Sequence, residues 1–344
     1  MTEILTTKQR LDAFAKLGAI LHNPDQELST LIHSAKQFNA WFTPESTANA
    51  VKAIADMLNS DDLKQWIASE PQSTQDKQLS IGLILAGNIP LVGFHDILCV
   101  LATGNKALIK LSSQDTKLIP YILKKLVHIE PAFEGKIEYI DRLTDFDAVI
   151  ATGSNNTSRY FEYYFSKVPH VIRRNRNSVA VLNGNETDDE LTKLGHDIFD
   201  FFGLGCRNVS KIYVPRGYDF KKFFEGIESF KPVIDHHKYN NNYDYNKSIF
   251  LVNLDKHLDN GFLLLKEDDR LASPLAVLYY QEYDDIRILE EQLIEKANEI
   301  QCVVSADKLK IETVNPGESQ KPRLWDYADG VDTVAFLRGI IGKL

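Results

Sequence analysis

The feature that most constrains the fold is a run of alternating short apolar strands and amphipathic helices that begins near residue 79. Strands are predicted at Leu79–Ala86, Lys106–Leu111, Ile137–Ile140, Ala148–Ala151 and Ser178–Asn183, with helices between them at Leu91–Leu101, Lys117–His128 and Asn156–Phe165. Glycines mark both turns of the first strand–helix–strand unit. Alternation of this length predicts an α/β fold, in which helices cover both faces of a mostly parallel sheet.

The segments on either side of this run also contain regular structure. Residues 1–70 are predicted to be helical, with Thr6 or Thr7 capping the first helix and Thr43 and Pro44 beginning a later one. After residue 184 the predicted elements are helices at Asp188–Phe202 and Ile286–Ile300, strands at Phe250–Val252, Ala276–Tyr280 and Cys302–Val304, and a polar-aromatic loop at Asn240–Asn246. We therefore expect a second domain of mixed helix and strand.

Composition and short patterns argue against several classes of function. The chain has 344 residues and a formal net charge of −9, which speaks against a nucleic-acid partner because phosphate binding needs a basic face. The N-terminus lacks a signal-peptide pattern, and the apolar run at 79–85 is too short to cross a bilayer, so we expect a cytoplasmic protein with no transmembrane segment. His236-His237 has no third ligand at a suitable spacing, so no metal site is predicted.

Cys206 is the residue best suited to covalent chemistry. It follows Gly203-Leu204-Gly205 and precedes Arg207, so that glycines leave room around the sulfur and a positive charge lies nearby. A nucleophilic cysteine needs such access, because the thiolate is the reactive form. Cys99 and Cys302 lie in apolar runs and are expected to be buried. The alternative for Cys206 is a small residue in a tight turn, and both interpretations remain open at this point.

Three loops at the ends of predicted strands carry groups that can bind an oxyanion or a cofactor. Asn88, just before Pro90, can offer a side-chain N–H to an oxyanion. Lys110, Ser112 and Ser113 can hold ribose or phosphate at the end of the next strand. Thr152-Gly153-Ser154 opens a helix, so its amides can face a cofactor. Ordinary turn and cap roles are the alternative for each loop taken alone.

Taken in order, these motifs resemble the aldehyde dehydrogenase superfamily. Asn88-Ile89-Pro90 is similar to its Asn-Phe-Pro oxyanion loop, and Thr152-Gly153-Ser154 matches its Thr-Gly-Ser loop. The segment from Leu101 to Lys110 is similar to its Leu-Ala-Ala-Gly-Asn…Val-Lys segment. Gly205-Cys206 with Lys211–Val214 resembles its Gly-Gln-x-Cys…Arg-Val-Tyr-Val segment, which implies that Cys206 is the nucleophile.

Within that superfamily the chain most resembles the acyl-CoA reductase branch, typified by the fatty acid reductase of bacterial bioluminescence. The supporting stretches are Trp41–Pro44, Gly93–Asp96, Asn241–Asn246 and Ala328–Thr333. The resemblance implies an aldehyde-dehydrogenase-like fold. N-terminal helices and a Rossmann-type dinucleotide-binding domain would span 1–182, and a catalytic α/β domain 183–312. The tail at 313–344 would return to the cofactor domain or to a partner subunit, and a homo-oligomer is a family expectation.

Three departures from the superfamily pattern bear on the reaction. Between 172 and 178, arginines stand about where hydrolytic members carry the glutamate that activates water, which implies exchange of the thioester with a thiol such as CoA. Arg270 stands in place of the glutamate that usually holds the nicotinamide ribose. Lys110-Leu111-Ser112-Ser113 replaces Lys-Pro-Ser-Glu, so no carboxylate repels a 2′-phosphate, and NADPH is expected rather than NADH.

The resemblance thus implies NADPH-dependent reduction of a long-chain acyl-CoA to an aldehyde through an acyl-enzyme. Cys206 would be the nucleophile, Asn88 and the Cys206 backbone N–H the oxyanion donors, and the loops that contain Lys110 and Gly153 the cofactor site. The acyl donor could also be a carrier protein or an acyl-transferring partner enzyme. Two other functions remain: an aldehyde dehydrogenase that oxidises to an acid or acyl-CoA, and a non-catalytic nucleotide-binding scaffold.

Overall fold

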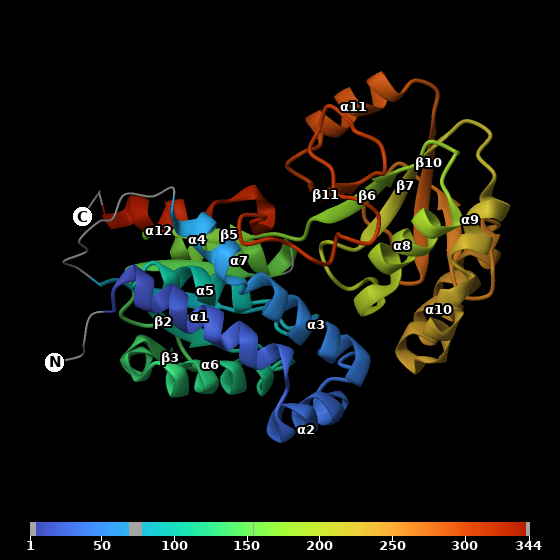
Figure 1. Ribbon diagram of the computed structural model, residues 1–344. Helices are drawn as coiled ribbons and strands as arrows, with labels where there is room; N and C mark the ends of the chain where they lie inside the picture. Colours follow the sequence, from blue (N-terminus) through green and yellow to red (C-terminus); the bar gives the residue numbers. More distant parts are fainter. Residues whose placement is uncertain (1–4, 69–77, 154, 342–344) are drawn as a thin grey trace. The chain divides into compact units, whose positions relative to one another are not determined.

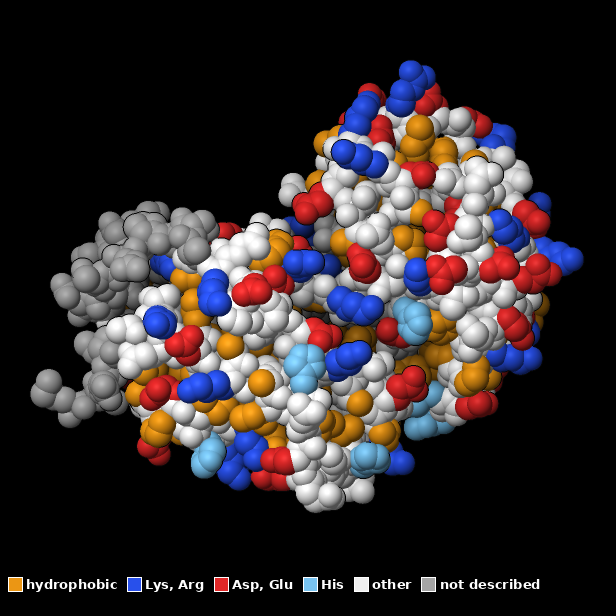
Figure 2. Space-filling model, in the orientation of Figure 1, with side chains coloured by type: hydrophobic (Ala, Val, Ile, Leu, Met, Phe, Trp, Pro, Cys, Tyr) orange, Lys and Arg blue, Asp and Glu red, His pale blue; other side chains and the backbone are white. Residues whose placement is uncertain are grey.

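The computed structural model describes residues 5–68, 78–153 and 155–341. The chain divides into two compact units: Met1–Asn175 together with Pro322–Leu344, and Arg176–Lys321. Figure 1 shows the elements of each unit, and none of the described helices is long and apolar enough to cross a membrane. On the face drawn in Figure 2, Lys and Arg side chains are interspersed with Asp and Glu.

The first unit contains a parallel sheet of five strands in the order β3-β2-β1-β4-β5. Its strands are β1 (Ser80–Ile84), β2 (Lys106–Lys110), β3 (Ile137–Tyr139), β4 (Ala148–Thr152) and β5 (His170–Arg173). The three middle residues of β1 and of β2 are buried, as are the first four of β4. Continuous apolar runs of this kind are typical of parallel strands that are covered on both faces.

Two helices of this unit, α1 (Thr7–His22) and α3 (Pro44–Met57), start at side chains that the sequence analysis identified. The other helices are α2 (Gln26–Ser34), α4 (Ser60–Ala68), α5 (Phe94–Ala102), α6 (Leu118–Ile129), α7 (Asn155–Phe165) and α12 (Thr333–Ile341). Thr6 caps α1 and Thr43 caps α3 with Pro44 as its first residue. Helix α1 packs against α3, α5 and α6, α7 packs on β4 and β5, and α12 packs on α5.

The second unit contains a six-stranded sheet in the order β11-β6-β7-β10-β9-β8, parallel except for β8. Its strands are β6 (Asn177–Val181), β7 (Val209–Pro215), β8 (Leu258–Asp259), β9 (Leu264–Glu267), β10 (Val277–Tyr283) and β11 (Ile300–Val304). Its helices are α8 (Asp188–Phe199), α9 (Phe220–Gly226), α10 (His237–Asn253) and α11 (Ile286–Glu295). Both units are therefore α/β, as predicted.

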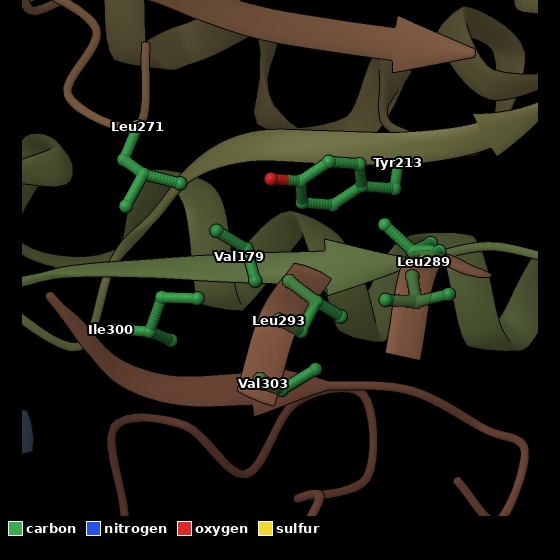
Figure 3. Packing of buried hydrophobic residues seen from close by; sticks show 8 residues of the cluster. Val179, Tyr213, Leu271, Leu289, Leu293, Ile300 and Val303 are labelled. Atoms are coloured by element: carbon green, nitrogen blue, oxygen red, sulfur yellow. The ribbon is translucent and has the colours of Figure 1, made fainter. Parts of the chain in front are cut away.

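Part of the core of the second unit lies between α11 and the sheet (Figure 3). Leu289 and Leu293 of α11 pack on Val179 of β6 and Val303 of β11, together with Tyr213 of β7. Burial raises the pKa of Tyr213 to about 12. This packing supports the paired strands β6 and β7, and the turn that contains Cys206 lies between these two strands along the chain.

Two predictions about the second half were wrong. Asn240–Asn246 was expected to be a loop and Phe250–Val252 a strand, but both lie in helix α10. Its buried face consists of Tyr239, Tyr243, Asn246 and Phe250, which recur at helical spacing. The side-chain amide of Asn246 donates to the carbonyl oxygens of Asn242 and Leu275, so this buried asparagine is satisfied inside the helix. The polar composition of the segment concealed this periodicity.

Candidate active site

The predicted cofactor and oxyanion residues of the first unit follow three strands of one parallel sheet. Asn88 comes after β1, Lys110 ends β2 with Ser112 and Ser113 following, and Thr152 ends β4 with Gly153 next. Because β1, β2 and β4 are parallel neighbours, these loops lie at the same edge of the sheet. The chain passes from β1 to β2 on one side and returns to β4 on the other. Such a switch point is where open α/β sheets bind ligands.

At two glycines of this edge, neighbouring side chains pack directly against the backbone. A Cβ added at Gly87 would lie 2.5 Å from Oγ of Ser112, and one added at Gly153 would lie 3.0 Å from Cβ of Thr157 in α7. Both positions therefore favour glycine, since a larger residue would displace neighbouring atoms. Asn88, Lys110 and Ser113 are exposed at the same edge, and Ser154 lies outside the described residues.

Cys206 lies in a tight turn between α8 and β7 of the second unit. The turn is closed by the N–H of Asn208, which donates to the carbonyl oxygen of Gly205 over 3.0 Å. Cys206 is half-exposed, whereas Asn208 is only 3% exposed. The Asn208 side chain accepts the N–H of Gly205 over 2.8 Å and donates to the carbonyl oxygens of Asp197 and Asp200. Asn208 therefore anchors the cysteine turn to the end of α8.

The backbone just before this turn adopts an uncommon conformation. Phe201, Phe202 and Gly203 all have positive φ angles, of 54°, 59° and 77°. Left-handed conformations of two successive phenylalanines cost of order 1–3 kcal/mol each and gather at functional sites. The helix predicted to reach Phe202 accordingly ends at Phe199. This abrupt reversal brings the chain from α8 into the turn that contains Cys206.

A serine on β6 joins the turn to another cysteine. Ser178, which is fully buried, lies with its Oγ 3.0 Å from the carbonyl oxygen of Cys206 and donates to it. The same Oγ lies 3.0 Å from Sγ of Cys302 on β11. Cys302 is half-exposed, so the prediction that it is buried was wrong. It lies on β11, the edge strand of the sheet, whose outer side is bridged by Val314 next to Val304.

Cys99 differs from both. It is fully buried in α5, and burial raises the pKa of its thiol well above the ordinary value. A thiol of this kind remains protonated and does not act as a nucleophile. Among the three cysteines, access and a glycine-rich turn coincide only at Cys206.

Two of the arginines that the sequence analysis compared with superfamily glutamates are each engaged with a carboxylate. Arg173, at the end of β5, is 3% exposed and forms an ion pair with Asp96 of α5. Arg270 forms paired hydrogen bonds with Asp268, which lowers the pKa of that carboxyl to about 2. In the described part of the chain, no three His, Cys, Asp or Glu side chains gather as a metal site would need.

The sequence analysis singled out candidate reactive side chains but not the residues that hold their loops. Asn208, two residues after Cys206, was not singled out, although asparagine is common in turns. Ser178 and Asp115 were also missed, because they lie far along the chain from the loops they contact. The structure brings Cys206, Ser178 and Asn208 together within the second unit, and the Asn88, Lys110 and Gly153 loops to one edge within the first.

Residues 19–223 match the family described as acyl-CoA reductase (LuxC). No curated protein matches the chain. Three similar solved structures are aldehyde dehydrogenase 21 from Physcomitrella patens with the product succinate, an NADP-dependent glyceraldehyde-3-phosphate dehydrogenase from Bacillus halodurans C-125 with NADP, and an NAD-dependent aldehyde dehydrogenase from Sinorhizobium meliloti. Their identities to this chain are 12%, 14% and 11%, and their TM-scores are 0.67, 0.64 and 0.66.

The alignments with these structures cover 98%, 91% and 92% of this chain and 85%, 78% and 72% of theirs. Likeness at this level of identity shows a shared fold, so the aldehyde-dehydrogenase-like fold expected from the sequence is confirmed. The family match extends over more than half of the residues, from α1 of the first unit through the turn that contains Cys206 to α9 of the second. The chain belongs to the acyl-CoA reductase (LuxC) family.

Proposed function

We propose that the protein reduces a long-chain acyl-CoA thioester to an aldehyde with NADPH, through an acyl-enzyme on Cys206. The observation that carries this proposal is the cysteine turn itself. Cys206 is half-exposed, its carbonyl is held by Ser178, and its turn is anchored by Asn208 in a chain of the acyl-CoA reductase family. A fixed, accessible thiol is what covalent catalysis on a thioester needs.

The reaction would begin with attack of the Cys206 thiolate on the thioester carbonyl. The Asn88 side chain and the Cys206 backbone N–H would stabilise the oxyanion, a contribution of about 3–4 kcal/mol for one donor. Collapse of the tetrahedral intermediate breaks the bond between the acyl carbon and the sulfur of CoA, which leaves as the thiolate, and the acyl group stays on Cys206. After reduction of the acyl carbon, the thiohemiacetal releases the aldehyde and returns the thiolate.

NADPH would bind at the edge of the first unit's sheet where β1, β2 and β4 end. Lys110 and Ser113 are exposed there, and Gly87 and Gly153 stand where a side chain would collide with neighbouring residues. Bound NADPH supplies the hydride that reduces the acyl group. Lys110 would attract the 2′-phosphate, and the hydroxyls of the two serines would donate to it. No carboxylate would repel the phosphate at this point. The similar Bacillus halodurans enzyme was solved with NADP, which supports a nicotinamide cofactor at this fold.

The state of Arg173 supports reduction over oxidation to an acid. Hydrolysis of an acyl-enzyme needs a base that activates water. A guanidinium cannot accept a proton, and Arg173 is buried against Asp96. The acyl group on Cys206 would therefore persist until it is reduced or returned to a thiol. The same persistence is compatible with an acyl group that arrives from a carrier protein or a partner enzyme.

The test is to incubate the protein with a long-chain acyl-CoA, map the added mass by peptide, and then add NADPH. We expect an acyl adduct on Cys206 that NADPH discharges as aldehyde. Cys206→Ala should form no adduct, whereas Cys302→Ala, the matched control for the other half-exposed cysteine, should be acylated normally.

Three results would contradict the proposal. Full acylation of Cys206→Ala would show that Cys206 is not the nucleophile. Release of the acyl group by water as a free acid would favour an aldehyde dehydrogenase that oxidises its substrate. A protein that binds NADPH but forms no adduct with acyl-CoAs of several lengths, and whose Cys206 resists alkylation, would be a nucleotide-binding scaffold.

A further inference from the structure

The loop that contains Asn88 is held by a buried carboxylate from another loop. Leu91, three residues after Asn88, has a left-handed backbone with a φ of 61°. Its N–H donates to Oδ2 of Asp115 over 2.9 Å. The second carboxylate oxygen, Oδ1, accepts the N–H of Leu118 at the start of α6 over 3.3 Å. Asp115 is 5% exposed, so this contact lies inside the protein.

The other end of the same loop is held as well. Nδ2 of Asn39, a residue only 4% exposed, donates to the carbonyl oxygen of Gly87 over 3.4 Å. Ser112 packs on the α-carbon of Gly87, and the carbonyl oxygen of Ser112 accepts the N–H of Asp115 over 3.2 Å. The loop at 87–91 is therefore attached at both ends, and Asp115 takes part in the attachment of the end that follows Asn88.

The carboxylate is needed because the backbone it holds is unfavourable. A leucine in the left-handed region persists only where its surroundings hold it there. Without Asp115 the buried N–H of Leu91 would also lose its acceptor. The loop would then relax toward an ordinary turn, and the side chain of Asn88 would move with it.

We propose that Asp115 is a positioning residue that fixes the side chain of Asn88 where the oxyanion forms. This inference rests on the proposed function, in which Asn88 donates to the oxyanion. Displacement of a catalytic group by about 1 Å costs on the order of a hundredfold in rate. Loss of Asp115 therefore slows acylation of Cys206, although Asp115 itself touches no substrate.

The experiment measures single-turnover acylation of Cys206 by a long-chain acyl-CoA in the absence of NADPH, so that cofactor binding does not enter the rate. The variants are Asn88→Ala, Asp115→Ala and the double variant. We expect Asn88→Ala to be slower by about 10²–10³-fold and Asp115→Ala by roughly tenfold to a hundredfold. The double variant should be no slower than Asn88→Ala, since Asp115 acts through Asn88.

Asp147→Ala is the matched control. Its Oδ2 accepts the N–H of Ser80 over 2.8 Å at the start of β1, at the opposite edge of the same sheet. It removes a comparable carboxylate-to-backbone contact and should acylate at the wild-type rate. Asp115→Asn keeps one oxygen for the two N–H groups of Leu91 and Leu118, and an intermediate rate is expected. The acylation rate of Asp115→Asn tests the proposal if Asp115→Ala does not fold.

The outcomes separate the positioning role from the proposed function. Wild-type acylation in Asp115→Ala and Asp115→Asn, with Asn88→Ala slow, would overturn the role of Asp115 alone. Losses that multiply in the double variant, or an equal loss in Asp147→Ala, would assign Asp115 a general structural role and also overturn it. Acylation of Asn88→Ala at the wild-type rate would contradict the role of Asn88 as oxyanion donor in the proposed function itself.

Discussion

Arg173 and Asp96 form a buried, two-point ion pair in the first unit. Nη2 of Arg173 lies 2.6 Å from Oδ1 of Asp96, and Nε lies 3.1 Å from Oδ2. Arg173 also donates to Oγ1 of Thr333 over 2.8 Å and to the carbonyl oxygen of Ala328 over 2.5 Å. Burial lowers the pKa of Arg173, but the charge and hydrogen bonds of Asp96 outweigh it and leave the pKa raised. One guanidinium thus joins β5, α5 and the C-terminal segment.

Arg173→Met should destabilise the protein by about 3–5 kcal/mol, because it leaves the carboxylate of Asp96 buried without a partner. Removing both charges, in Arg173→Met with Asp96→Leu, should recover much of that loss. Denaturant unfolding measures both values. Arg216→Met is the control, since it breaks an exposed pair with Asp284 and should change stability little. A loss below about 1 kcal/mol for Arg173→Met would show that the pair does not hold the segment.

Asn208→Ala should loosen the turn that contains Cys206. The partly buried N–H of Gly205 and two carbonyls at the end of α8 would lose their partner, at a cost of about 1–3 kcal/mol. Misplacement of the thiol should slow acylation at least tenfold. Asn246→Ala removes an equally buried amide that donates to two carbonyls in the same unit, and it should lose stability without slowing acylation. Equal rates in the two variants would contradict a specific role for Asn208.

Ser113→Glu should shift the cofactor preference from NADPH toward NADH. The added carboxylate would lie at the exposed end of β2, where we place the 2′-phosphate, and like charges in contact cost several kcal/mol. The ratio of kcat/KM for NADPH to that for NADH should fall at least tenfold, which corresponds to about 1.4 kcal/mol. Ser113→Gln has the same size without the charge and should leave the ratio near wild type. An unchanged ratio in Ser113→Glu would place the 2′-phosphate elsewhere.

Lys211 should make the stability of the protein depend on pH in the alkaline range. It is fully buried on β7, where its Nζ donates to the carbonyl oxygen of Asp269 and to Oε1 of Gln281. Burial lowers the pKa of Lys211 from 10.5 to about 8. Between these values the unfolded chain holds the proton that the folded protein has released, so stability rises with pH in that window.

The measurement compares unfolding of the wild type and Lys211→Met between pH 7 and 11. The free energy of unfolding of the wild type should rise relative to the variant from pH 8 to about 10.5 and then level off. The same lowered pKa predicts that the buried charge is unfavourable at neutral pH. Parallel curves for the two proteins across this range would contradict a lowered pKa for Lys211.

Local patterns carried much of the fold prediction, and they failed where tertiary contacts override them. The strands around Leu83 and Ile109 were predictable because buried parallel strands are continuous apolar runs. Helix α10 was not, since its asparagines favour turns when read alone. Only the burial of Tyr239, Tyr243 and Phe250 on one face made a helix the better structure. The same limitation placed Cys302 in the interior, whereas its strand lies at the edge of the sheet.

The sequence by itself determined most of the alternation of strands and helices between residues 79 and 183, and the family, because periodicity and motif order are properties of the chain. It also singled out Cys206 and Asn88 through their immediate neighbours. The tertiary structure alone decided which residues hold these loops. Asp115 meets Leu91 across 24 residues, and Arg173 meets Asp96 across 77. Such partners are selected by burial and backbone geometry, which no short stretch of sequence contains.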